Sequence, residues 1–223
     1  MRSIICFLLL LFPWCIRRLL LTWIFGYKIH PTARIGLSLI LPRRLEMGRG
    51  CIIGHFTMCR SSVDAVIMGD DSTIGSLCTI TGISTLDKTR FSHIQDRKCE
   101  MVLGENVSIP SRKFFDCNGG IYIGAFTTIA GQWTQFLTHS IDVYKSRQDA
   151  KPIRIGKYCF IGTGCTLLPG SGLPDCTVLA AGSVLTRMHT NGYCVYAGVP
   201  AEIRKRFDPS DFLWAKRTNR FVY

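Results

Sequence analysis

The chain has 223 residues, of which 47% are hydrophobic and 19% charged, so it is long enough for one sizeable core and lacks the polarity of a disordered protein. Its net charge of +12 is uneven: residues 1–49 hold 8 basic and 1 acidic side chains, residues 50–186 hold 12 and 11, and residues 187–223 hold 7 and 3. A nearly neutral middle argues against a duplex-binding protein, whose cations follow a groove through the fold. We therefore expect no nucleic-acid partner.

The 11 cysteines are an odd number and contain no Cys-x-x-Cys pair. This pattern disfavours both a closed disulfide framework and a structural zinc site. We expect a reducing cytosol, cysteines that act as small apolar side chains, and no bound metal.

The first segment, residues 1–27, is apolar and basic. A run over residues 4–16 contains Pro13 and is followed by Arg17 and Arg18, and no small-x-small cleavage site follows, so a secretion signal is not expected. A single membrane span would place both arginines near mid-membrane, an unfavourable position that the many leucines and isoleucines can offset.

We favour two short helices lying in the membrane interface, because Pro13 breaks the run and because aromatic and basic residues suit the headgroup zone. The residues in question are Trp14, Trp23 and Tyr27, with Arg17, Arg18 and Lys28. The alternative is an apolar helix packed on the protein's own core or on a neighbouring subunit. The favoured reading implies the inner-membrane surface as a partner through residues 1–27.

A six-residue period dominates the chain after residue 28. Six aliphatic residues follow one another at intervals of six: Ile155, Ile161, Leu167, Leu173, Leu179 and Leu185. Small residues recur four positions later, at Cys159, Cys165, Ser171 and Ser183, and the same register holds at Met68, Ile74, Ile80 and Leu86. This period fits neither a helix nor plain strand alternation, but it fits a short strand followed by a tight corner. Three such units close one triangular coil, and residues 29–201 supply roughly seven to nine stacked coils.

Two stretches leave this period and predict loops. Residues 87–102 are polar and charged, and residues 136–153 contain His139. Binding and catalytic groups concentrate in such loops.

Three further stretches join the repeats in carrying a family resemblance: residues 137–142 (Leu-Thr-His-Ser-Ile-Asp), 180–187 (Ala-Ala-Gly-Ser-Val-Leu-Thr-Arg) and 197–201 (Ala-Gly-Val-Pro-Ala). With them the sequence resembles the hexapeptide-repeat acyltransferases, in particular the maltose, galactoside and colanic-acid O-acetyltransferases. The resemblance implies an all-β, left-handed parallel β-helix, which we assign to residues 28–201, after the apolar helical segment at 1–27 described above. It also implies homotrimers, with acetyl-coenzyme A in the groove between two β-helices. Residues 202–223 form the cap and tail, which we expect to begin with a short amphipathic capping helix.

The resemblance also implies roles for single residues. His139 matches the catalytic histidine, which takes the proton of the attacking hydroxyl. Either Asp116 or Asp142 orients the imidazole, and we favour Asp116 because adjacent coils place it underneath His139. Trp133 and Asp142 are candidate contacts for the saccharide. Phe160, Thr163, Ala181 and Thr186 match positions near the pantetheine arm, and Arg187, Arg204 and Lys205 match cations near the coenzyme's phosphates.

We therefore expect an acetyl-coenzyme A-dependent O-acetyltransferase that acts on a saccharide hydroxyl in bacterial surface polysaccharide synthesis, on the cytoplasmic side of the inner membrane. One alternative is N-acetylation of an amino sugar nucleotide or a serine-type acceptor. The other is a non-catalytic β-helix scaffold.

Overall fold

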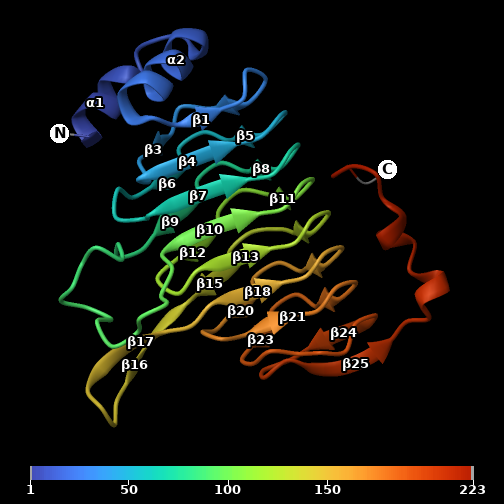
Figure 1. The fold of residues 1–223 in the computed structure, drawn as a ribbon. Helices are drawn as coiled ribbons and strands as arrows, with labels where there is room; N and C mark the ends of the chain where they lie inside the picture. The colour runs from blue at the N-terminus through green and yellow to red at the C-terminus, as the bar shows by residue number, and fades with distance from the viewer. Residues whose placement is uncertain (1, 222–223) are drawn as a thin grey trace.

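The computed structural model describes residues 2–221, which form a parallel β-helix with two α-helices at its first coil (Figure 1). Each turn of the chain adds one short strand to each of three sheets. Sheet A consists of β1 (Lys28–Ile29), β4 (Arg44–Met47), β7 (Ala65–Met68), β10 (Glu100–Leu103), β13 (Ile121–Ile123), β18 (Ile153–Ile155) and β21 (Gly172–Leu173).

Sheet B consists of β2 (Arg34–Ile35), β5 (Ile52–Ile53), β8 (Thr73–Ile74), β11 (Ser108–Ile109), β14 (Thr128–Ile129), β19 (Phe160–Ile161), β22 (Val178–Leu179), β24 (Cys194–Ala197) and β25 (Glu202–Arg206). Sheet C consists of β3 (Leu39–Ile40), β6 (Met58–Cys59), β9 (Thr79–Thr81), β12 (Phe114–Asp116), β15 (Gln135–Leu137), β20 (Thr166–Leu167) and β23 (Val184–Leu185). The described residues thus complete seven coils, and β24 begins another.

The six-residue period marks the strands as predicted. The six aliphatic residues that recur from Ile155 to Leu185 each end one strand of β18 to β23 and are 0–4% exposed. Corresponding residues of successive coils pair in register, as Ile129 does with Ile161 and Ile161 with Leu179. Leu86 is the exception: it is 60% exposed in a loop, and its place in the repeat was wrongly assigned.

Small residues beside the corners link each coil to the next. The Ser72 hydroxyl donates to the Gly104 carbonyl at 2.6 Å and accepts the Val107 amide at 3.0 Å. Cysteines occupy several equivalent positions, among them the buried Cys78, Cys159 and Cys165. Burial raises the pKa of Cys159 to about 12, so this thiol is a packing group rather than a nucleophile.

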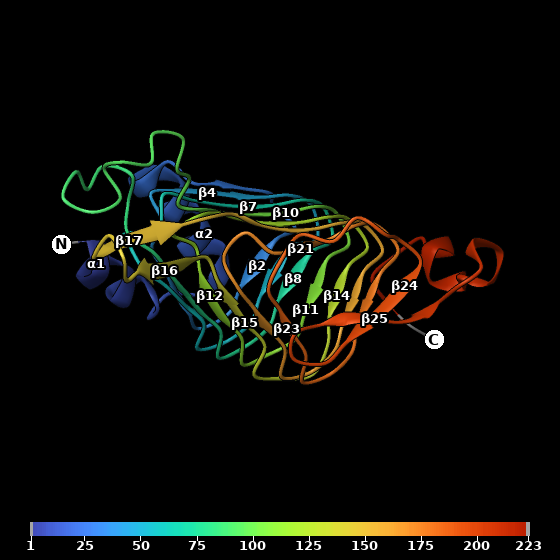
Figure 2. The same ribbon diagram turned by 90° about the horizontal axis from the view of Figure 1, so that it is seen from below.

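Both departures from the period lie where sheet C leads into sheet A. One is the loop over residues 82–98, between β9 and β10; the other contains a hairpin, β16 (His139–Asp142) and β17 (Arg147–Ala150), between β15 and β18. Figures 1 and 2 show them projecting from the same edge of the β-helix. His139 is therefore the first residue of a strand in this hairpin rather than part of an irregular loop.

Two helices, α1 (Arg2–Leu9) and α2 (Trp14–Phe25), cover the first coil. Pro13 separates them, and Gly26 ends α2 in the left-handed conformation at φ 68°, which glycine adopts without a Cβ clash. Their inner face joins the core through buried Cys6, Leu9 and Leu21. No helix within residues 2–221 is both long enough and apolar enough to cross a membrane.

Three residues expected at lipid headgroups face the protein instead. Arg17 is 4% exposed and donates to the carbonyls of Ile35 and Gly36, to the latter at 2.8 Å. Tyr27 is also buried, and its hydroxyl donates to the Pro42 carbonyl at 2.7 Å. Trp14 Nε1 donates to Ala33 at 3.0 Å. These side chains donate hydrogen bonds to backbone carbonyls at the open end of the first coil. A buried carbonyl without a donor is unfavourable, so these hydrogen bonds hold the three side chains on the protein rather than at lipid headgroups.

Replacement of Arg17 by leucine is expected to destabilise the fold by about 1–3 kcal/mol, because the Ile35 and Gly36 carbonyls then lose their buried donor. Chemical denaturation followed by circular dichroism measures the change. Arg18→Leu is the matched control, since Arg18 makes only a long contact, 3.5 Å, with the Ile29 carbonyl. Equal stability of the two variants would contradict the capping role of Arg17.

The last coil is closed by a strand, not by the expected capping helix. β25 pairs antiparallel with β24 at the edge of sheet B, and two short 3₁₀ helices follow, η1 (Pro209–Asp211) and η2 (Leu213–Lys216). Pairing with β24 gives hydrogen-bond partners to backbone groups that an open sheet edge would leave exposed. For this reason the segment forms a strand, although the spacing of its apolar residues is that of a helix. The tail then runs back along the β-helix, where Arg220 donates to the Asp71 carbonyl at 2.5 Å.

Candidate active site

The register of sheet C places Asp116 next to His139. β12 and β15 are neighbouring parallel strands, in which Asp116 pairs with Leu137. His139 follows two residues later, at the start of the hairpin. Residues 23 positions apart in the sequence thus meet at the edge where sheet C leads into sheet A.

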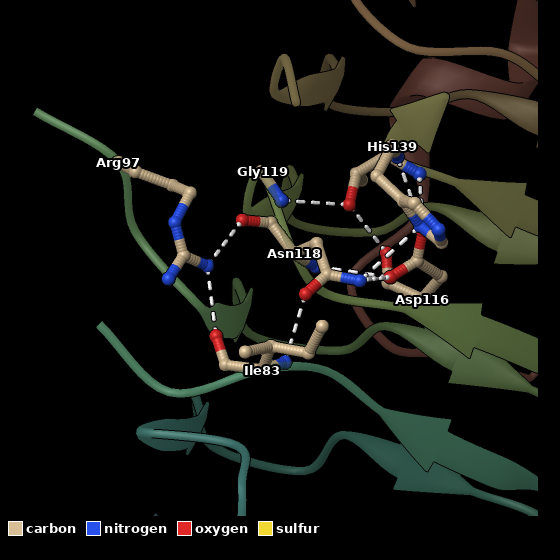
Figure 3. Close-up of polar contacts among 7 residues, drawn as sticks. Ile83, Arg97, Asp116, Asn118, Gly119 and His139 are labelled. Atoms are coloured by element: carbon tan, nitrogen blue, oxygen red, sulfur yellow. Dashed lines mark hydrogen bonds and ion pairs between the residues drawn. The ribbon is translucent and has the colours of Figure 1, made fainter. Parts of the chain in front are cut away.

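The Asp116 carboxylate is 1% exposed and is surrounded by donors (Figure 3). Its Oδ2 accepts the backbone N–H groups of Thr138 and His139, both at 3.1 Å, and contacts Nδ1 of the His139 ring. Because a carboxylate only accepts, the proton of the neutral imidazole lies on Nδ1 and the lone pair on Nε2. The His139 side chain is 38% exposed, so this site combines a buried anchor with an accessible base.

The pKa of His139 is raised from its ordinary value. The largest cause is the hydrogen bond to Asp116, which favours the protonated ring; partial burial opposes it, and the charge of Asp116 adds to the rise. His139 is consequently a stronger base than an isolated histidine.

Asn118 holds the carboxylate from the other side. Its Nδ2 donates to Asp116 Oδ1 at 2.5 Å and lies 3.2 Å from His139 Nδ1, and its backbone N–H donates to Asp116 Oδ1 at 3.1 Å. The sequence predictions assigned no role to Asn118. The only available signal was its spacing of two residues from Asp116, which keeps both side chains at one corner.

Arg97 ties the loop over residues 82–98 to this pair. Its guanidinium donates to the carbonyls of Ile83 at 2.8 Å, Asn118 at 3.0 Å and Ser84 at 3.0 Å. The Ile83 amide in turn donates to Asn118 Oδ1 at 2.8 Å (Figure 3). The loop and the Asp116–His139 pair therefore share one hydrogen-bond network, and no sequence pattern indicated this use of Arg97.

The same loop also contacts the imidazole and encloses a hollow of its own. The Phe91 ring meets His139 edge-on with centroids 6.2 Å apart, and Arg97 stacks on Phe91 at 4.7 Å. The hollow has a volume of about 470 Å³, and its lining includes Arg90, Phe91 and Arg97. Phe91 thus both lines this hollow and contacts the His139 ring.

Asp142, the other carboxylate considered for orienting His139, lies at the far end of β16. It forms an ion pair with Lys145 at 3.7 Å and accepts the Tyr144 amide at 3.1 Å. Three residues of extended chain separate it from His139, roughly 10 Å. Of the two, Asp116 is the one that contacts the ring.

Trp133 lies at the opposite edge of sheet C, where sheet B leads into sheet C. It is 66% exposed and lines a groove of about 370 Å³ together with Arg112, Phe114 and Gln135. Six residues of chain lead from Trp133 to His139, roughly 20 Å when extended. Within one chain, neither His139 nor Asp116 is among the residues that line this groove.

Two of the residues matched to the coenzyme, Thr163 and Ala181, continue the Trp133 edge. Thr163 Oγ1 donates to the Gln132 carbonyl at 2.8 Å, one coil beyond Trp133. A Cβ added to Gly162 would lie 2.5 Å from the Ala181 nitrogen, so the next corner packs directly on this one. These positions form one exposed ridge parallel to the axis of the β-helix.

The remaining residues matched to the coenzyme are dispersed. Phe160 packs edge-on against Trp214 of the tail, with centroids 5.4 Å apart, on sheet B. Arg187 binds the Glu202 carboxylate at 2.9 Å, and Thr186 beside it is exposed. The other two, Arg204 and Lys205, are exposed on β25. A single chain brings none of these side chains to His139.

Within residues 2–221, no three histidine, cysteine, aspartate or glutamate side chains gather in an arrangement that would hold a metal ion.

No protein-family model and no curated protein sequence matches the chain. Solved structures do match. The polysialic acid O-acetyltransferase OatWY superposes with a TM-score of 0.58 at 18% identity, over 81% of this chain and 84% of that one. A variant of AntD, an N-acyltransferase from Bacillus cereus in complex with dTDP-4-amino-4,6-dideoxyglucose and coenzyme A, gives a TM-score of 0.51 at 16% identity, over 89% and 94% of the two chains.

Both matches cover more than four fifths of this chain and of the matched chain. The chain has the left-handed parallel β-helix fold of the hexapeptide-repeat acyltransferases.

Proposed function

We propose that the protein transfers an acetyl group from acetyl-coenzyme A to a hydroxyl of a saccharide, with His139 as the general base. The observation that carries this proposal is the pairing of a buried Asp116 with a partly exposed His139. The structural neighbours support the reaction class, because one is named for O-acetyl transfer to polysialic acid and the other binds an amino sugar nucleotide and coenzyme A.

The geometry supplies the proton-transfer part of this reaction. His139 Nε2 takes the hydroxyl proton while the acceptor oxygen attacks the thioester carbonyl. The C–S bond then breaks, and the imidazolium returns the proton to the departing thiolate. Asp116 stabilises the imidazolium while it exists, because its Oδ2 faces Nδ1.

The coenzyme site is proposed to lie between two copies of the chain in a homotrimer. In one chain the ridge of Thr163 and Ala181 and the base His139 occupy opposite edges of sheet C. A neighbouring copy whose ridge faces the His139 edge brings the two together. Light scattering that finds a monomer at assay concentration would contradict this arrangement.

The reaction is tested with the full chain, acetyl-coenzyme A and a panel of saccharides, amino sugar nucleotides and serine. Thiol release reports turnover, and mass spectrometry with mild alkaline treatment separates O-acetyl esters from N-acetyl amides. The proposal predicts an alkali-labile acetyl group on a saccharide. Products restricted to amines would contradict hydroxyl acylation, and coenzyme A binding without turnover on any acceptor would favour a scaffold.

A further inference from the structure

The two N-terminal helices carry apolar side chains on both faces. The inner face covers the first coil, as described above, while the outer face meets solvent. We define the outer apolar face by its large exposed residues: Ile4, Phe7, Leu8, Leu11, Phe12, Ile16, Leu19, Trp23 and Ile24, which are 39–84% exposed. A soluble chain rarely exposes so many neighbouring apolar side chains without a partner.

An apolar hollow extends this surface onto the β-helix. It has a volume of about 520 Å³ and lies between α1 and the first two coils, with Phe7, Leu10, Phe56 and Met58 in its lining. The apolar area thus continues past the helices.

The part of the β-helix next to the two helices is cationic. Glu46 is the only acidic residue among residues 1–49, and it is paired with Lys28 at 2.9 Å and with Arg44 at 3.0 Å. Arg34 and Arg43 are exposed in the first coil, and within the described chain neither forms an ion pair. An apolar helix face on a coil that carries unneutralised arginines is complementary to anionic lipid, whose headgroups attract the cations while the acyl region receives the apolar side chains.

We propose that the outer apolar face docks the protein on an anionic lipid surface, with the two helices in the interface and the β-helix standing away from it. This arrangement suits the inner leaflet of a bacterial membrane. Trp23, 84% exposed, is the residue best placed at the headgroup boundary, whereas Arg17 serves the fold and does not contact lipid.

This docking fixes the distance between the lipid surface and the candidate active site. His139 follows β15, the fifth strand of sheet C, so four strand spacings of about 4.8 Å separate its coil from the first, roughly 19 Å. The helix layer adds about 10 Å. If the proposed acyl transfer holds and the acceptor is linked to lipid, the acylated sugar must reach this far from the membrane. It is therefore a sugar remote from the lipid anchor, not the one attached to it.

The test is flotation of the full chain with phosphatidylcholine vesicles, with and without phosphatidylglycerol. The protein is expected to float with the anionic vesicles. The double variant Leu11→Glu/Trp23→Glu is expected to lower the vesicle partition coefficient by about tenfold or more, because two charges enter the apolar face. The control, Val143→Glu/Tyr144→Glu, alters residues 77% and 98% exposed at the tip of the distant hairpin and leaves flotation unchanged.

Thermal melts establish that both double variants fold. Equal flotation of the Leu11/Trp23 variant and the wild type would overturn the proposal, as would equal binding to neutral and anionic vesicles. If the wild type does not bind vesicles but forms assemblies that the Leu11/Trp23 variant does not form, the face is a contact between copies of the chain. That result also overturns the lipid-docking proposal. None of these measurements depends on acyl transfer, so their outcome is independent of the proposed function.

Discussion

Replacement of His139 by alanine is expected to lower kcat/KM for acyl transfer by roughly 10²- to 10⁴-fold, the usual contribution of a positioned general base. The loss should fall on kcat, because the ring acts on the acceptor proton in the transition state. Thiol release under saturating acetyl-coenzyme A measures it.

The control for this variant is His30→Ala. His30 is exposed in the first coil, four coils from His139, and contacts Thr32 through Nδ1 at 2.8 Å. Its replacement should leave the rate unchanged. Full activity of His139→Ala would remove the base from the proposed mechanism.

The second large effect is expected from Asp116→Asn, which keeps the side-chain size but removes the charge. The maximal rate should fall by roughly 10²- to 10⁴-fold, because the imidazolium loses its stabilising carboxylate and the ring its fixed tautomer. Steady-state kinetics measure the loss, and a melting curve separates it from unfolding, since the buried donors around residue 116 lose one acceptor.

The pH profile of this variant provides a readout that a structural defect would not give. In the wild type the base is active when neutral, so kcat/KM declines as the pH falls through the raised pKa of His139. In Asp116→Asn the hydrogen bond and charge that raise this pKa are lost, while burial still lowers it. The acidic limb should therefore move to lower pH. An unshifted limb would show that Asp116 does not control the base.

The raised pKa of His139 also determines how the free energy of unfolding depends on pH. A histidine whose folded-state pKa is raised stabilises the fold at pH values below its unfolded pKa. This contribution is lost as the pH rises through the raised pKa of His139. Asp116→Asn should remove that pH dependence.

The sequence was informative where a single local rule governs the fold. A strand and a corner every six residues require an aliphatic residue at one place and a small residue at another, so Ile161, Leu167 and Cys165 could be placed directly. Leu86 satisfies the spacing yet lies in a loop, because a period alone does not show where the winding is interrupted.

Tertiary contacts decided the features that the sequence left open. The segment from Glu202 has the spacing of an amphipathic helix but forms a strand, because the edge of β24 offers a row of backbone partners. Arg17 lies among leucines and was assigned to lipid, but the carbonyls of the first coil bind it instead. Such partners become visible only once the coils are stacked.

The candidate site shows the same division. The family resemblance indicated His139, and the stacking of coils favoured Asp116 over Asp142. The sequence did not indicate Asn118 and Arg97, because their role depends on the course of the loop over residues 82–98. This loop returns to the corner that holds Asn118, and the six-residue period does not determine its course.

The central claim, that Asp116 prepares His139 Nε2 as a base, is tested most directly by a nitrogen NMR titration of the full chain labelled at histidine. The account predicts that the neutral His139 ring carries its proton on Nδ1 and titrates at a higher pH than in Asp116→Asn. A neutral ring protonated on Nε2, or a titration midpoint identical in the two proteins, would contradict the account.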